Sequence, residues 1–260
     1  MSTRVPQPCL LELPFNSVRP DLPDPLDQTG LLCAPFYELK AALGRSPQGH
    51  PIVQPGQLVR AHQIYPERTP FIVDVRGYDG RDPAKTGYIV TKYDPSSPPK
   101  THFPIKELNL RSDEHFYVMR GKLRPAIVLQ TISTDFYNLN NPEPYVWAAP
   151  CFTFKEKHSQ SYRCRVAALK LPHLFYLPGH HHGFNESSVL RFEHIQPVTA
   201  VGVEPIFIDG QQSFLSEPAW AILQHQLHKF ISGKILDAGL EETLQAYGQL
   251  VLEAFGLPAS

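Results

Sequence analysis

The sequence lacks the motifs that most directly identify an enzyme class. It contains no P-loop, no G-x-G-x-x-G, no G-x-S-x-G and no H-E-x-x-H pattern, so the usual signatures of nucleotide binding, dinucleotide binding, serine hydrolysis and zinc-dependent hydrolysis are absent. Cysteine is scarce, and the four cysteines form no C-x-x-C pair, which argues against a zinc ribbon or a redox motif. A catalytic site would therefore have to be built from a less formal arrangement of residues.

Long apolar runs and a strong net charge are missing as well. No stretch is apolar for long enough to span a bilayer. The first sixteen residues contain only the short apolar run Cys9–Leu11, which Glu12 and Pro14 interrupt, and this is not typical of a signal peptide. The formal net charge of −1 provides no overall field for nucleic acid or acidic lipid, so such binding needs a local patch. We expect a cytoplasmic protein with reduced thiols and no membrane association.

Proline, by contrast, is abundant, with 27 residues against 16 glycines. Such a composition favours short strands, turns and extended loops over long helices. Many short segments rich in β-branched and aromatic residues, separated by turn signals, predict a mainly β fold of the barrel or sandwich type. The expected strands are 57–61, 71–75, 88–90, 115–119, 126–129, 144–149, 162–166, 188–192 and 195–198.

The two ends of the chain differ from this central β region. Residues 1–50 form a proline-rich N-terminal extension that contains a short helix over 35–44, where a proline begins the segment and a glycine ends it. At the C-terminal end, residues 211–260 carry two apolar stripes at helical spacing. They predict a helical hairpin that packs on the barrel or at a dimer interface. The barrel domain itself is expected over 51–210, with an insertion at about 62–114.

Three segments carry the most specific signal. Gly121–Gln130 contains Arg-Pro-Ala-Ile-Val-Leu, Val146–Thr153 ends in Pro-Cys-Phe-Thr, and Asn185–Ile195 contains Val-Leu. Their order and spacing over residues 115–200 resemble the PemK/MazF family of toxin ribonucleases, and Pro55–Val59 is similar to the opening strand of that family. The resemblance implies an SH3-like small barrel, usually a homodimer. It also implies a metal-independent endoribonuclease that cleaves single-stranded RNA, needs no cofactor and is blocked by an antitoxin protein.

The resemblance assigns catalytic roles to Arg124 and Thr153. In RNA the 2′-hydroxyl can attack the neighbouring phosphate, and a planar guanidinium can bridge two phosphoryl oxygens as negative charge develops. The position of Arg124 before Pro125 matches the catalytic arginine of the family, and we expect it at a strand start beside a loop. Thr153 departs from the pattern because Phe152 precedes it. Either a bulge at Cys151–Phe152 restores its direction, or Thr153 faces the opposite side of the strand.

A local basic patch follows this threonine. Basic side chains near aromatic residues suit single-stranded RNA, through phosphate attraction and base stacking, although an ordinary solvated surface explains the same composition. The predicted RNA-binding residues are Lys155, Lys157, His158, Arg163 and Arg165. We expect Arg163 and Arg165 to point outward from a half-buried strand over 162–166.

Three classes of function remain open from the sequence. The first is an endoribonuclease of the toxin type, and the second is a non-catalytic binding module for nucleic acid or protein on the same barrel. The third is a metal hydrolase that uses His180–His182 with other histidines such as His194. Contiguous histidines alternate in direction in an extended chain, so they seldom share one metal ion. We therefore predict the endoribonuclease and no metal site.

Overall fold

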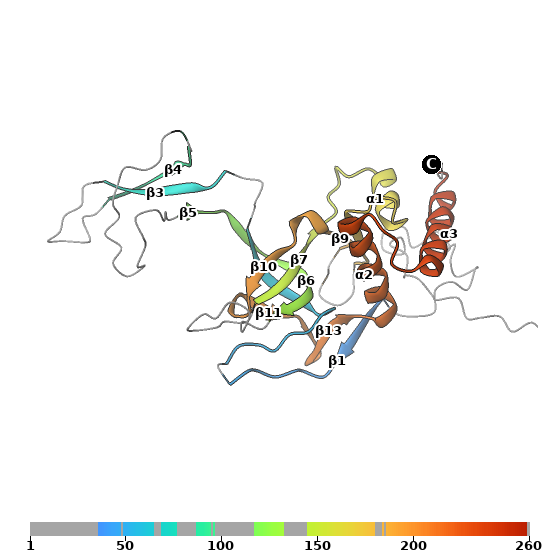
Figure 1. Cartoon of the computed structure of the whole chain (residues 1–260), viewed down its shortest axis with the longest axis horizontal. Coiled ribbons are helices and arrows are strands. Elements are labelled where there is room, and N and C mark those ends of the chain that lie inside the picture. The colour runs from blue at the N-terminus through green and yellow to red at the C-terminus, as the bar shows by residue number, and fades with distance from the viewer. Residues whose placement is uncertain are drawn as a thin grey trace, which may run out of the picture. The chain divides into compact units, whose positions relative to one another are not determined.

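The computed structural model describes residues 36–47, 49–64, 69–76, 87–94, 96, 117–132, 145–179, 184 and 186–258. The proline-rich arm 1–30 and the histidine run 180–182 lie outside the described residues. Two compact units are present: unit 1 comprises Met1–His62 and Leu123–Ser260, and unit 2 comprises Gln63–Lys122 (Figure 1). Most of the predicted insertion at 62–114 falls within the sequence range of unit 2.

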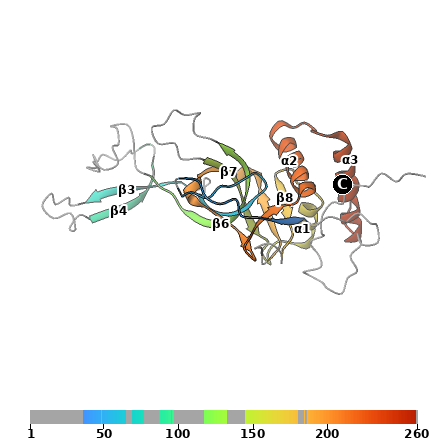
Figure 2. The ribbon, with the colours of Figure 1, turned by 90° about the horizontal axis from the view of Figure 1, so that it is seen from below.

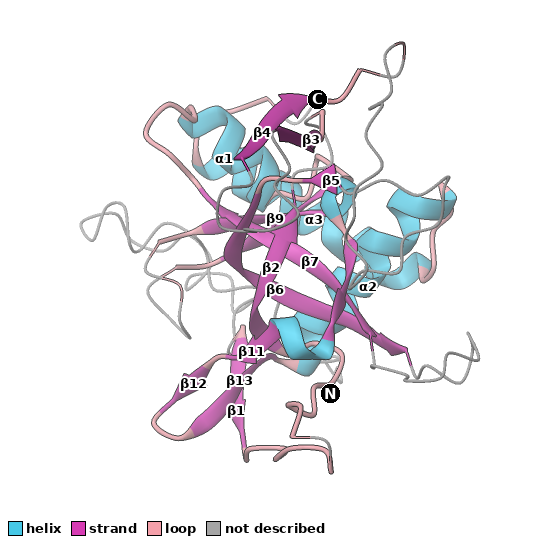
Figure 3. Cartoon of the chain, turned by 90° about the vertical axis from the view of Figure 1, so that its left-hand side faces the viewer, coloured by secondary structure: helices cyan, strands magenta, loops and turns pink. Residues whose placement is uncertain are grey.

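The chain is mainly β, and its largest sheet lies in unit 1 (Figure 3). The strand order is β11-β2-β6-β7-β9-β8, and β10 pairs with β7 beside this path. Since β11 and β8 are the two ends of this order, the described strands form an open sheet. The strands are β2 (Leu58–Ile64), β6 (Gly121–Ile132), β7 (Tyr145–Thr153), β8 (Leu174–Leu177), β9 (Ser188–Arg191), β10 (Gln196–Thr199) and β11 (Val203–Pro205).

Strand β7 is the centre of this sheet because it changes partner along its length. One edge pairs with β6, while the other edge pairs with β10 over its first half and with β9 over its second half. The pairing of β6 with β7 shifts by one residue between Val128 and Gln130, so Leu129 forms a bulge. A bulge of this kind bends the strand that contains it, here β6, and increases its twist.

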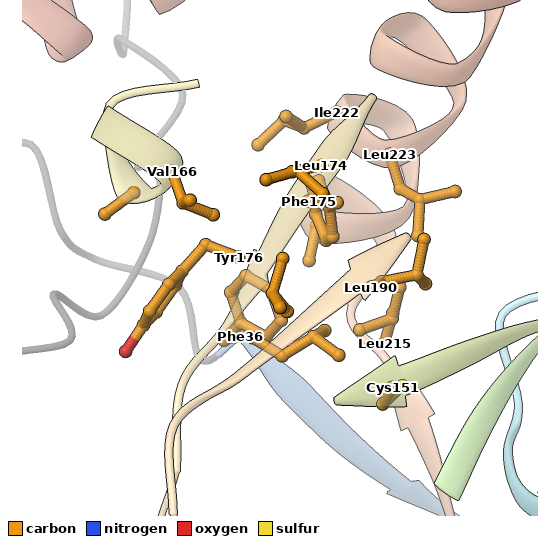
Figure 4. Packing of buried hydrophobic residues seen from close by; sticks show 14 of the residues in the cluster. Phe36, Cys151, Val166, Leu174, Phe175, Tyr176, Leu190, Leu215, Ile222 and Leu223 are labelled. Atoms are coloured by element: carbon orange, nitrogen blue, oxygen red, sulfur yellow. The ribbon is translucent and has the colours of Figure 1, made fainter. Parts of the chain in front are cut away.

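Side chains on the two faces of the sheet enter two separate clusters. Ala126, Val128, Val146 and Ala148 pack on one face with Val59 and Val203. Ile127, Ala149 and Cys151 point to the other face, where they join the larger core. Figure 4 shows Cys151 in this core, near Leu190 and Leu215. The period of two residues in each strand produces this division. Both faces of β6 and β7 are covered, which explains why their central segments are apolar without alternation.

The segment after residue 35 is a strand and not the predicted helix. β1 (Tyr37–Lys40) pairs antiparallel with β13 (Gln211–Leu215), which in turn pairs with β12 (Phe207–Ile208). Phe36 and Tyr37 are buried in the larger core. The pattern of this short segment was compatible with a helix, but pairing with a strand about 175 residues later overrides local propensity. Gly44 adopts a φ of 81° in a loop and ends no helix.

Residues 162–166 were predicted as a strand, and the structure shows a helix there. α1 (Gln160–Ala167) begins after Ser159, whose side chain accepts a hydrogen bond from the Tyr162 amide. The helix ends in a pair of backbone bonds, from Leu169 to Val166 and from Lys170 to Arg165, which is the Schellman arrangement. Leu169 has a φ of 55°, where glycine is usual. Five residues of apolar and basic alternation are too few to distinguish the two periods.

Both predicted C-terminal helices are present. α2 (Glu217–Ser232) begins after the cap residue Ser216 and ends at Gly233, and α3 (Ala238–Ala254) begins after the cap residue Asp237. Figure 1 shows both helices beside α1, and Figure 2 shows α2 beside β8. Ile222 and Leu223 of α2 are almost completely buried, and burial of a side chain of this size is worth roughly 1.5–3 kcal/mol.

Unit 2 is a small antiparallel sheet of order β4-β3-β5. Its strands are β3 (Phe71–Arg76), β4 (Gly87–Lys92) and β5 (Tyr117–Val118), with Ile72 opposite Thr91 on one side and Tyr117 on the other. In the described parts of both units, no helix combines the length and apolar character required to cross a bilayer.

Candidate functional site

Arg124 lies over an aromatic ring on the face of the sheet. Ala126 pairs with Pro150, and continuing this register by two residues places Arg124 opposite Phe152. The guanidinium carbon of Arg124 is 4.6 Å from the centroid of the Phe152 ring, a distance at which a cation is attracted by the ring face. Arg124 is the fourth residue of β6, so the expectation that it sits at a strand start was wrong. The Phe152 ring is therefore a contact surface for the Arg124 guanidinium.

A second arginine contacts the same ring. Phe152 pairs with Val189 in β9, and Arg191 lies two residues farther along on the same face. Its guanidinium carbon is 5.6 Å from the Phe152 centroid. The Nε and Nη2 atoms of Arg191 donate hydrogen bonds of 2.8 and 2.6 Å to Oε1 of Glu193. This carboxylate orients Arg191 and neutralises part of its charge.

A histidine completes the arrangement. His194 belongs to the short 3₁₀ helix Phe192–His194 that follows β9, and its ring centroid is 5.5 Å from that of Phe152. Two guanidinium groups and one imidazole therefore surround one ring. We call these four residues, Arg124, Phe152, Arg191 and His194, the Phe152 cluster. Such a set can bind a phosphate through the guanidinium groups and move a proton through the imidazole.

Thr153 does not share the face of the sheet on which Arg124 lies. Cys151, Phe152 and Thr153 pair in unbroken register with Leu190, Val189 and Ser188. No bulge lies at Cys151–Phe152, so Thr153 shares a strand face with Cys151 and points away from the face that carries Phe152. Of the two alternatives for this threonine, the regular strand is the one observed. Arg124 in β6 and Thr153 in β7 therefore lie on opposite faces of the sheet.

The predicted RNA-binding residues lie in the loop after β7 and in α1. Within this group Arg163 has a structural role, because its Nη2 donates a 2.9 Å hydrogen bond to the Lys155 carbonyl and its guanidinium carbon is 5.7 Å from the Phe154 ring. Arg163 lies on a helix and is partly buried, so its predicted outward direction on a strand was wrong. Arg165 is exposed in the last turn of α1. Lys155 and Lys157 are exposed too.

His158 is held inside this basic loop. Its Nδ1 accepts a 3.0 Å hydrogen bond from the Lys155 amide, and its ring lies 5.4 Å from that of Tyr162. Partial loss of solvent, together with the positive charges of Lys157, Arg163 and Lys155, lowers the pKa of His158 below 6.5. A neutral imidazole at pH 7 that already accepts a backbone bond is better suited to shaping the loop than to binding phosphate.

The described residues do not support the metal-site hypothesis. His180–His182 lie outside them, and no three histidine, cysteine or acidic side chains within the described ranges are grouped in a way that could hold a metal ion. His194, which was considered as a companion ligand, instead belongs to the Phe152 cluster.

Sequence reasoning identified Arg124 but did not place Arg191 and His194 beside Phe152. The available signal was the position of Arg191, two residues after Val189 in a predicted strand, where it continues one face. This signal becomes useful only once β7 is known to lie between β6 and β9. No model of a protein family and no curated protein matches the chain.

Proposed function

We propose that the chain is a metal-independent endoribonuclease of the PemK/MazF type that binds and cleaves single-stranded RNA at the Phe152 cluster. The observation that carries this proposal is the Arg124 guanidinium held 4.6 Å above the Phe152 ring, with Arg191 and His194 around the same ring. Guanidinium planes and aromatic rings stack on bases, and guanidinium N–H groups bind phosphates. A cluster with both properties suits a single strand better than a duplex.

The chemistry follows from the groups in the cluster. The 2′-oxygen of a ribose attacks the adjacent phosphorus while the bond from phosphorus to the 5′-oxygen breaks. The imidazole of His194 accepts the proton of the 2′-hydroxyl, and the departing 5′-oxygen takes a proton from solvent. Arg124 stabilises the added charge on the phosphoryl oxygens, a role that a preorganised donor performs at low reorganisation cost. His194 thus supplies the proton transfer in place of Thr153, the residue to which the resemblance assigned a catalytic role.

The same proposal includes the SH3-like small barrel as the fold type. It is supported by the change of partner along β7, which pairs with β6, β10 and β9, because strands that pass between sheets form the corners of compact β structures. Lys155, Lys157 and Arg165 would extend the RNA path beyond the end of β7. A homodimer, an inhibitory antitoxin protein and a cytoplasmic location belong to the proposal as well.

A non-catalytic binding module is the second candidate. Two observations favour it: Thr153 points away from Arg124, and Glu193 already engages Arg191 through two hydrogen bonds. A cluster without a working proton acceptor would still bind single-stranded RNA through charge and stacking. Binding without cleavage is therefore the result that would select this candidate.

The test measures cleavage and binding on the same RNA. A long single-stranded RNA is incubated with the purified protein in excess chelator, and binding is followed by fluorescence anisotropy. We expect cleavage by the wild type and a loss of about 10²–10³-fold in Arg124→Ala, in line with removal of a donor that stabilises transition-state charge. Arg60→Ala is the matched control, because Arg60 is an exposed arginine on β2 outside the cluster.

The outcomes separate the two candidates. Cleavage that survives chelator and is lost in Arg124→Ala but not in Arg60→Ala supports the endoribonuclease. Binding that weakens in Arg124→Ala without any cleavage supports the binding module. RNA that is neither bound nor cut, or cleavage unchanged in Arg124→Ala, would refute a role of the Phe152 cluster in RNA chemistry.

A further inference from the structure

The connection between α2 and α3 gathers large apolar side chains at the surface of the protein. Twelve large apolar side chains are exposed among the described residues, and four of them fall within 230–236. These four are Phe230, Ile231, Ile235 and Leu236, with exposed fractions between 38% and 72%. Single exposed apolar residues are common, but a contiguous group marks an interaction site. We call residues 230–240 the α2–α3 corner, which is the bend that joins the two helices in Figure 2.

Local hydrogen bonds fix the backbone of this corner. Gly233 ends α2 in the left-handed region, with a φ of 67°, and its amide donates to the Lys229 carbonyl. The amide of Lys234 donates a 3.1 Å hydrogen bond to Ser232 Oγ. Asp237 caps the first turn of α3. Because both helix ends are fixed locally, a partner that covers the corner orders little additional backbone.

The exposed side chains of the corner are not part of the core below it. In the part of the chain that the structure describes, Ile231, Ile235 and Leu236 neither belong to the core nor pack against it. Phe230 reaches inward with one contact, because its ring lies 5.8 Å from that of the buried Phe192. The apolar surface of the corner is therefore available for a contact with another molecule.

The charges of the corner indicate what kind of molecule it contacts. Residues 230–240 contain one lysine, Lys234, one aspartate, Asp237, and no other charged residue. A surface without net charge gains little electrostatic energy from nucleic acid or from anionic lipid. Lys234 forms no ion pair with any of the described residues. One positive and one negative side chain at the two ends of a short apolar segment are complementary to the same surface of a second copy, turned about a two-fold axis.

We propose that two copies of the chain associate through their α2–α3 corners about a two-fold axis. Ile231, Ile235 and Leu236 of one copy pack against the same residues of the other, and Lys234 of each copy faces Asp237 of the other. This gives the apolar centre and polar rim that homodimer interfaces share. The inference rests on the proposed function for the existence of a homodimer, and it assigns the surface through which that homodimer forms.

The experiment measures the dissociation constant of the dimer by sedimentation equilibrium of the full chain over a concentration series. Ile235→Glu places a carboxylate in the centre of the interface. Val201→Glu is the matched control, because Val201 is also β-branched and is 54% exposed against 52% for Ile235, but lies in the 3₁₀ helix Ala200–Gly202. Lys234→Glu tests the charge pairing. Far-UV circular dichroism verifies that each variant is folded.

We expect the wild type to form a dimer whose dissociation constant rises by about tenfold or more in Ile235→Glu, because burial of a carboxylate without a partner is unfavourable. Val201→Glu should dimerise like the wild type. Lys234→Glu should weaken the dimer by about two- to fivefold, because it places a second carboxylate opposite Asp237.

Four results would overturn the proposal: a wild type that is monomeric throughout the series, an unweakened dimer in Ile235→Glu, an unweakened dimer in Lys234→Glu, or an equal loss in Val201→Glu. Cosedimentation of monomeric protein with phosphatidylserine vesicles would assign the corner to a lipid surface and overturn it as well.

RNA cleavage by the same samples separates this inference from the proposed function. A monomeric wild type that cleaves RNA would remove the interface and leave the endoribonuclease in place. A dimer that dissociates in Ile235→Glu, in a protein that cleaves no RNA, would support the interface and remove the endoribonuclease.

Discussion

Substitution of Glu241 by glutamine should make the protein less stable at neutral pH and less sensitive to acid. The carboxylate of Glu241 joins α3 to α2 through His225 and Lys229, and it lies in the first turn of α3, where a negative charge is favourable. Glutamine keeps the shape of the side chain but removes its charge. It also presents an amide donor toward the Nε2–H of His225, which cannot accept it.

The size of the effect follows from the pKa of this carboxyl group. Hydrogen bonding lowers the pKa of Glu241 from 4.5 to about 2 against the opposing effect of burial. A group whose pKa is lowered by folding stabilises the folded state above its unfolded pKa and loses that contribution as the pH falls. The full difference would correspond to about 3 kcal/mol. Because the Lys229 side chain is 41% exposed, solvent screens the pair, and we expect about 1–2 kcal/mol.

The assay is urea unfolding at a series of pH values between 7 and 2, followed by tryptophan fluorescence. Trp147 in β7 and Trp220 in α2 both report on unit 1. The free energy of unfolding of the wild type should exceed that of Glu241→Gln by about 1–2 kcal/mol at pH 7. The gap should narrow as the pH falls from about 4.5 to about 2.

A neighbouring carboxylate provides the control. Glu242 is exposed on the same helix turn, so Glu242→Gln should follow the wild type throughout the pH series. A gap between wild type and Glu241→Gln that is independent of pH would show that the substitution acts through packing alone. Equal stability of the two proteins at pH 7 would refute the role of the buried carboxylate.

Two further predictions concern α3. Gly248→Ala should lower the free energy of unfolding by about 1–3 kcal/mol, because the new Cβ would lie 2.5 Å from a backbone oxygen. The control Gly239→Ala should not destabilise the protein, because its Cβ meets nothing closer than 3.5 Å. Equal effects of the two substitutions in urea unfolding would contradict the packing argument. Asp237→Ala should lower the free energy of unfolding by about 1 kcal/mol, since Asp237 Oδ1 accepts a 3.0 Å hydrogen bond from the Leu240 amide. An unchanged free energy of unfolding would show that this helix cap does not stabilise the protein.

Sequence patterns located two kinds of element: an apolar strand that is covered on both faces, and a helix whose cap residues lie at its own ends. The apolar strand 126–129 lies within β6, and the stripe of α2 lies between a serine cap and a left-handed glycine. Where a sequence pattern predicted the wrong element, the contact that determines the structure joins residues far apart in the sequence. β1 depends on β13, and the four apolar residues of β8, all buried, show no alternation that would distinguish a strand from a loop in the core.

The candidate site could be predicted only in part for the same reason. Arg124 was identifiable because Arg-Pro at the head of an apolar strand is a local pattern. Arg191 and His194 reach the site through the order β6-β7-β9, which joins segments about 70 residues apart, and single-sequence patterns contain no such order. The buried pair of His225 and Glu241 likewise joins two helices whose apolar stripes were predicted but whose mutual rotation was not.

The bulge at Leu129 decides which residue meets Arg124. Gln130, Thr131 and Ile132 pair with Trp147, Val146 and Tyr145, and this register, continued without interruption, would place Arg124 opposite Thr153. The extra residue shifts the pairing by one, so that Ala126 meets Pro150 and Arg124 meets Phe152 instead. The register shift in β6 therefore sets which residue of β7 lies opposite Arg124. Because a shift of one residue also reverses the faces, the hydroxyl of Thr153 leaves the site, and an aromatic ring with Arg191 and His194 around it takes its place.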